Sequence, residues 1–174
     1  MAESFGPMET MFQEIEAALS VRLYFLAILA SLAIPDVCAA LISSNGESSG
    51  KKYKAWYRAN LAATYPRLTD VDFWSLRCGL VHQGRFGHRD MQYDRVIFTF
   101  PDTAFQAHNS PIQWPDITYL MMDAPTFCRD VVVAGRKWFS DNENDPVVQK
   151  NLDRLVRLRL NGLPPRITGA PIIA

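Results

Sequence analysis

The sequence has few cysteines, and their spacing indicates neither a metal site nor a disulfide framework. Only three occur among 174 residues, at Cys38, Cys78 and Cys128. No two of them have the close spacing of zinc ligands, and an odd number leaves one thiol unpaired. We therefore expect a protein of a reducing compartment that binds no metal.

The chain also lacks net charge. Eighteen basic residues balance eighteen acidic ones, so no overall field attracts the protein to nucleic acid or to a membrane surface. The charge is nevertheless uneven, because the stretch between Glu47 and Asp70 is basic: it contains no acid and includes Lys51, Lys52, Lys54, Arg58 and Arg67. Lys51, Lys52 and Lys54 are candidates for contact with an RNA backbone, and a solvated helix face is the alternative.

Several motifs of common enzymes are missing. The sequence contains no glycine-rich phosphate loop, no zinc cluster and no serine-nucleophile elbow. The usual nucleotide-dependent enzymes are therefore excluded, and we expect no cofactor. The first residues, MAESFGPMETMFQEIE, carry acids where a signal peptide would carry basic residues, which favours a cytoplasmic location.

No uninterrupted apolar run is long enough to cross a membrane. Residues 23–42 are apolar apart from Ser31 and Asp36. Pro35 and Asp36 interrupt this run after about a dozen residues, whereas a spanning helix needs about 20. We expect a buried core helix here and no membrane contact.

What remains is the pattern of a single, mainly α domain over residues 1–174. Apolar residues at helical spacing predict a helix through Ile15 to Ile34, which Pro35 ends or kinks. A second short helix is expected from Pro35 onward. Ser48 or Ser49 can cap a third helix, whose predicted core stripe is Tyr53, Trp56, Tyr57 and Leu61. Further helices are expected over 124–139 and 145–160, followed by an extended tail over 161–174.

A fourth helix and a small β element complete the prediction. Thr69 and Asp72 resemble a capping box that opens the fourth helix, and Gly84 marks its end. Residues 96–100 and 117–122 have strand-like composition, so we expect a two-stranded β-ribbon joined by a surface loop over 101–116.

The most informative pair of residues is Arg77 and His82, near the end of the fourth helix. Arg77 projects from the edge of an apolar face, where it must meet an acid, reach water or hold an anion. Five positions correspond to a rotation of about 140° on a helix, so we do not expect the two side chains to converge within one chain. Two copies packed about a two-fold axis would bring these side chains together, which favours a homodimer.

Arginine and histidine together suit RNA cleavage. An imidazole that titrates near neutrality can move a proton between the 2′-hydroxyl, the phosphate and the leaving oxygen. A guanidinium supplies fixed positive charge and forked donors that match phosphate oxygens, with no need for a metal ion.

With these residues the chain resembles the HEPN superfamily, whose members are helical bundles with an arginine and a histidine separated by a spacer of four to six residues. Arg77 and His82 match that motif, and IPDVCAAL, SGKKYKAWY and LRCGLVHQG occur in the order typical of small bacterial HEPN-like proteins. The resemblance implies a HEPN-like helical bundle and a dimeric, metal-independent endoribonuclease with catalytic residues Arg77 and His82. It also implies a toxin or phage-defence setting in which a protein antitoxin could be the partner.

Two positions depart from the pattern, and alternative functions stay open. Active members commonly have a polar residue after the arginine, where this chain has Cys78. The chain also has Gly84 two places after the histidine, where members silenced by nucleotide transfer have a tyrosine. One alternative is a non-catalytic HEPN-like dimer that binds nucleotide, RNA or a protein. The other is an interaction protein in which Arg77 only forms a salt bridge, with Asp36 as the acid of choice.

Overall fold

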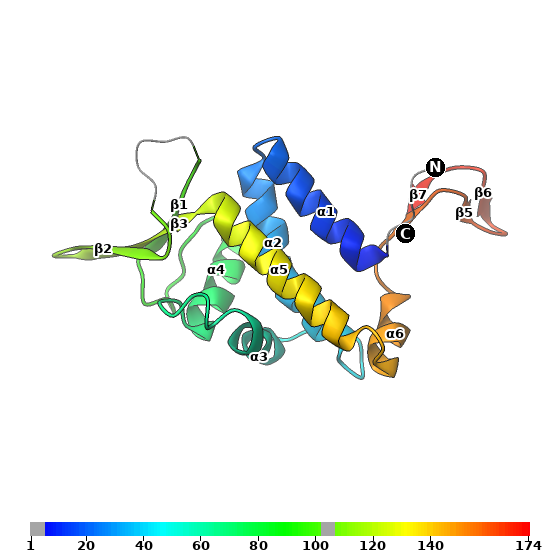
Figure 1. The fold of residues 1–174 in the computed structure, drawn as a ribbon, viewed down its shortest axis with the longest axis horizontal. Helices are drawn as coiled ribbons and strands as arrows, with labels where there is room; N and C mark the ends of the chain where they lie inside the picture. Colours follow the sequence, from blue (N-terminus) through cyan, green and yellow to red (C-terminus); the bar gives the residue numbers. More distant parts are fainter. Residues whose placement is uncertain (1–5, 102–106) are drawn as a thin grey trace.

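The computed structural model describes residues 6–101 and 107–174, and six α-helices account for most of them (Figure 1). The helices are α1 (Pro7–Ser20), α2 (Tyr24–Leu41), α3 (Gly50–Asn60), α4 (Asp70–Gln83), α5 (Ala124–Asn142) and α6 (Pro146–Leu152). A small sheet lies at one end of the bundle, and the C-terminal segment lies at the other. The expected mainly α class is therefore correct.

Helix α2 is the centre of the bundle. It packs against α1, α3, α4, α5 and α6, and side chains from all six helices join one hydrophobic cluster. Its mean composition is so apolar that it has no distinct polar face, as expected for a helix surrounded by others.

The predicted helix through Ile15 to Ile34 is in fact two helices. The chain breaks between α1 and α2 at Arg22, which has φ 62°, and the Leu23 amide closes the turn by donating to Ala18 O at 2.8 Å. Such a turn usually uses glycine, so the uninterrupted apolar pattern concealed it. The start of α2 is also exposed rather than buried, since Phe25 and Leu26 are each about half accessible.

No second short helix starts at Pro35, contrary to the prediction. Pro35 lies inside α2, which continues for six more residues. Proline in a helix removes one backbone hydrogen bond, and burial of the surrounding residues, such as Leu32 and Cys38, offsets that loss. The continuation places Asp36 in the body of a helix and directs it toward α4.

Helices α3 and α4 agree closely with the prediction from the sequence. Ser49 caps α3 by accepting from the Lys52 amide, and the four predicted stripe residues are buried. Thr69 and Asp72 form the expected capping box at the start of α4. Gly84 ends α4 with φ 64°, the left-handed conformation in which glycine is least strained.

The sheet has three strands, so the predicted two-stranded ribbon is wrong. Its strands are β1 (Arg95–Thr99), β2 (Ser110–Trp114) and β3 (Ile117–Asp123), in the order β1-β3-β2. β3 pairs parallel with β1 and antiparallel with β2. β2 lies within the predicted loop over 101–116, where Pro111 is tolerated because the strand is at the edge. Residues 102–106 of that loop lie outside the described part of the chain.

The C-terminal prediction needs two corrections. α6 ends at Leu152 rather than near Leu160, because the apolar residues beyond it, such as Val156 and Leu158, remain exposed and bury no helix face. The tail is not simply extended. It folds back as two short antiparallel pairs, namely β4 (Leu158–Arg159) with β7 (Ile172–Ile173), and β5 (Gly162–Leu163) with β6 (Ile167–Thr168).

One described helix, α2, is long and apolar enough to cross a bilayer. The argument that Pro35 shortens it is therefore wrong, since the helix runs through 18 residues. Half of it is buried within the protein, as in the central helix of a bundle, so length and composition alone are weak evidence for a membrane span.

An ion-pair cluster joins α5 to α1. Arg136 donates to Glu16 at 2.6 and 3.0 Å and to Glu9 at 2.8 and 3.1 Å. These hydrogen bonds from Arg136 hold the pKa of Glu16 below its ordinary value. A carboxylate with a depressed folded-state pKa stabilises the fold above its unfolded pKa, and this stabilisation is lost as the pH falls through the folded value.

We therefore expect acid to lower the free energy of unfolding less in the variant Arg136→Met than in the parent. The parent should lose this part of its stability below about pH 4.3, the ordinary value for glutamate. The effect is small, because all three side chains are partly exposed and screened by water. Urea unfolding at about pH 6 and about pH 3 measures it, and an equal loss in both proteins would contradict the account.

Candidate functional site

Arg77 lies on α4 facing α2, and three contacts fix its guanidinium. Its Nε donates to Asp36 Oδ2 at 2.9 Å, and its Cζ lies 5.2 Å from the centre of the Trp74 ring. The side chains of Arg77 and Asp36 are about one-fifth exposed. The predicted pairing of Arg77 with Asp36 is thus confirmed.

The third contact is with His82. Arg77 Nη1 lies 3.2 Å from His82 Nε2. A guanidinium nitrogen can only donate, so Nε2 is the acceptor in this contact, which requires the tautomer that carries its proton on Nδ1. His82 itself is exposed on the last turn of α4. The structure therefore joins a partly buried cation to an accessible proton carrier.

This convergence was not expected from the helical rotation between the two positions. Rotation describes where each Cβ starts, whereas arginine has a long side chain that can bend along the helix surface. The two functional groups therefore meet within one chain, and a second copy is not needed to bring them together.

Asp36 connects the pair to the start of α3. Its second oxygen, Oδ1, accepts from Ser48 Oγ at 2.7 Å. Gly50 lies so close to Trp74 that an added Cβ would be 3.0 Å from the ring. The N-terminal end of α3 therefore adjoins the site. Sequence reasoning missed the role of Ser48, but Trp74 could have been found, because it precedes Arg77 by three residues on the same helix.

Cys78 follows Arg77 and is half-buried. Burial raises the pKa of the Cys78 thiol, although the neighbouring Arg77 favours the thiolate. A thiol with a raised pKa is a poor nucleophile. Cys78 therefore adds little polar chemistry to the site, in contrast to the polar side chains that active HEPN members commonly have here.

The three candidate lysines have different environments. Lys52 donates its ammonium to Ser43 Oγ at 2.5 Å and to the Glu47 carbonyl at 2.8 Å, so it holds the loop before α3. Lys51 is exposed and Lys54 partly so, and no acidic partner is found for either among the described residues. Lys51 and Lys54 are therefore available to an anion, whereas Lys52 has a structural task.

The site is chemically suited to a phosphodiester. Arg77 is held from behind by Asp36, and the atoms at its tip point toward His82. A phosphate oxygen that replaces the imidazole at Nη1 would meet a fixed positive charge and lie beside a proton carrier. In the described residues no group of three histidine, cysteine or acidic side chains is arranged to hold a metal ion.

Comparison with known proteins gave no match to a family model, a curated protein or a solved structure. The resemblance to HEPN proteins therefore stays a prediction based on the Arg77 and His82 motif.

Proposed function

We propose that this protein is a HEPN-like endoribonuclease that cleaves RNA without a metal ion. The observation that carries the proposal is the contact of an anchored guanidinium, Arg77, with an exposed imidazole, His82. Both groups that the reaction needs, a fixed positive charge and a proton carrier, are present within 3.2 Å of each other.

The reaction is a transesterification. The 2′-hydroxyl oxygen attacks the adjacent phosphorus, and the bond from phosphorus to the 5′ oxygen of the next nucleotide breaks. One proton leaves the 2′-hydroxyl and one is delivered to the 5′ oxygen, so the products carry a 2′,3′-cyclic phosphate and a 5′-hydroxyl. Arg77 stabilises the negative charge that develops on the phosphate oxygens.

His82 takes one of these proton-transfer steps, as general acid or base. Among the described residues one imidazole, that of His82, contacts Arg77, whereas the reaction moves two protons. A second copy of the chain could supply the other imidazole, which is our reason for proposing a homodimer. Val81, which precedes His82, is 44% exposed and would be covered by such a partner.

The salt bridge favours a second candidate function. Asp36 satisfies part of the Arg77 fork before any ligand binds, and Cys78 is a poor hydrogen-bonding group. A non-catalytic module that keeps the fold and binds nucleotide, RNA or a protein antitoxin would have the same features. A third reading gives Arg77 only the structural task of tying α4 to α2.

Purified protein, incubated with mixed RNAs and a chelator, distinguishes these functions. The proposal predicts that the RNAs are cut while their 2′-deoxy counterparts are not, because the attacking hydroxyl is absent. Binding without cleavage would contradict the enzyme and favour the module. The purely structural role would be favoured if the parent neither binds nor cuts RNA and the variant Arg77→Ala fails to fold. Sedimentation equilibrium on the same sample should give twice the mass of the chain.

A further inference from the structure

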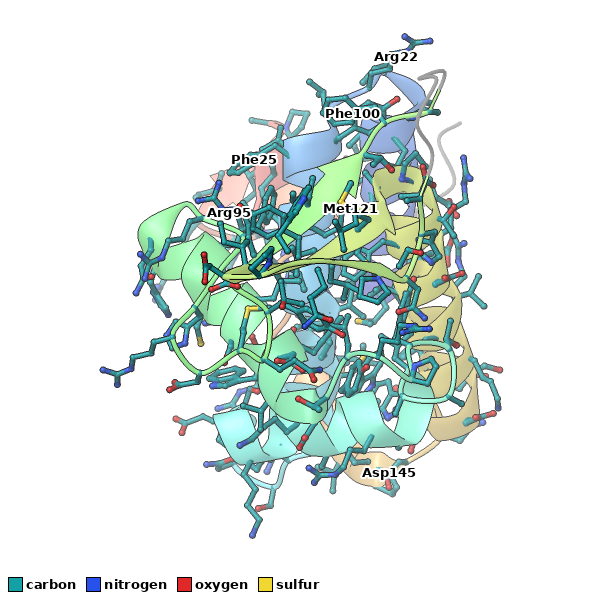
Figure 2. The ribbon with its side chains drawn as sticks, turned by 90° about the vertical axis from the view of Figure 1, so that its left-hand side faces the viewer. Arg22, Phe25, Arg95, Phe100, Met121 and Asp145 are labelled. Atoms are coloured by element: carbon teal, nitrogen blue, oxygen red, sulfur yellow. The ribbon has the colours of Figure 1, made fainter. Side chains whose placement is uncertain are left out.

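A positively charged concavity is formed by the loop that directly follows α4. The loop that follows α4 surrounds a pocket of about 410 Å³, whose lining includes Arg85, His88, Arg89, Tyr93, Asp94 and Arg95. Arg85 follows His82 by only three residues, across the cap at Gly84. Figure 2, which views the sheet end of the molecule, shows Arg95 beside α4.

The charge of this pocket is positive overall. No ion pair or hydrogen bond to the side chains of Arg85 and Arg95 is found in the described part of the chain. Arg89 is 87% exposed and lies 3.7 Å from Asp90, which is a loose contact. The one acid of the lining, Asp94, accepts from the Thr118 amide at 2.7 Å. Three arginines therefore stand against two carboxylates, Asp94 in the lining and Asp90 beside Arg89, which leaves a net positive charge.

The loop that carries these arginines is held at several points. Gln92 donates two hydrogen bonds to the buried carboxylate of Asp72, from its backbone N–H at 2.8 Å and from its side-chain Nε2 at 2.6 Å. The Val96 amide donates to Phe86 O at 2.8 Å. A Cβ at Gly87 would lie 2.8 Å from the Asp94 carbonyl, so the backbone here is closely packed. The concavity is consequently preformed, which reduces the entropy cost of binding.

We propose that this pocket binds a phosphate of the RNA strand next to the bond that is cut, and that the substrate is single-stranded there. The inference rests on the proposed function, because the lining of the pocket begins at Arg85, three residues after His82. Arginines contact phosphates independently of base identity and fix the register of the strand. A strand released from a double helix can bend its backbone into a concavity, whereas a regular duplex presents its phosphates on a convex surface.

The test uses a fluorescent, single-stranded octanucleotide with 2′-O-methyl groups, which cannot be cut because the attacking hydroxyl is blocked. The double variant Arg85→Gln and Arg95→Gln should bind it about tenfold more weakly than the parent. The slope of log affinity against log salt should also fall by about one. Arg85→Gln alone should lower the affinity about threefold. This single variant tests the pocket if the double variant is too unstable to measure.

The matched control is the double variant Lys150→Gln and Arg166→Gln, which removes the same charge at the other end of the molecule (Figure 1). Neither side chain has a described ionic partner. Three results would refute the proposal that the pocket binds an RNA phosphate. They are unchanged affinity in the pocket variants, an equal loss of affinity in the control, and no binding of the probe by the parent. Cleavage of ordinary RNA is scored separately, so a parent that binds through the pocket but cuts nothing refutes only the proposed function.

Discussion

Replacing His82 by alanine should reduce RNA cleavage by about 100-fold to 10,000-fold, the usual contribution of one general acid or base. His82 is exposed, and its one described side-chain contact is with Arg77. Its removal should therefore leave the fold intact. Arg77 keeps its hydrogen bond to Asp36 in the variant, so binding of a non-cleavable RNA should change little. The measurement is the single-turnover cleavage rate with protein in excess, which separates chemistry from binding.

Gln83→Ala is the matched control for this prediction. Gln83 is exposed on the same turn of α4, and no side-chain hydrogen bond of Gln83 is found among the described residues. It should cleave RNA at the parent rate. A His82→Ala variant that is as active as Gln83→Ala would remove the imidazole from the mechanism and refute the proposed role of His82.

Replacing Asp72 by alanine should lower the free energy of unfolding by about 4 kcal/mol, a large fraction of the stability of a typical domain. Asp72 is 1% exposed, and its carboxylate accepts four hydrogen bonds. Two come from Thr69 at 2.7 and 2.9 Å, and two come from Gln92. Alanine would remove one buried, charged acceptor that serves four donors at once, and hydrogen bonds to a charged group contribute more to stability than neutral ones.

Asp70→Ala provides the comparison, because Asp70 also lies in the first turn of α4. Its described partner is Arg58, whose side chain is 55% exposed, so its loss should cost less than about 1 kcal/mol. Urea unfolding of both variants measures the difference. If Asp72→Ala unfolds at the same urea concentration as Asp70→Ala, the buried network does not hold α4 and its loop together.

The sequence predicted well the features that depend on neighbouring residues. The capping box at Thr69, the cap at Ser49 and the stop at Gly84 are local hydrogen-bonding or backbone effects, and all three are confirmed. The buried stripe of α3 is likewise confirmed, because its helical spacing leaves one face to pack on the core.

The features that depend on distant residues were predicted poorly. Pro35 is tolerated because other helices surround α2, and the turn at Arg22 has no glycine or proline to reveal it. β2 forms only because β3 offers it an antiparallel partner. At the site, the sequence identified Arg77 and His82 as candidates but did not predict their contact. Arg77 is also bound to Asp36, which lies 41 positions earlier in the sequence.

The chemical identity of the cleaved ends tests the central claim most directly. A short RNA of known sequence, cut by the parent protein in the presence of a chelator, should give fragments with a 2′,3′-cyclic phosphate and a 5′-hydroxyl. Mass spectrometry distinguishes these ends from a 3′-hydroxyl and a 5′-phosphate. The predicted ends, lost in His82→Ala, would support attack by the 2′-hydroxyl at Arg77 and His82. Ends with a 5′-phosphate, or intact RNA after prolonged incubation, would contradict it.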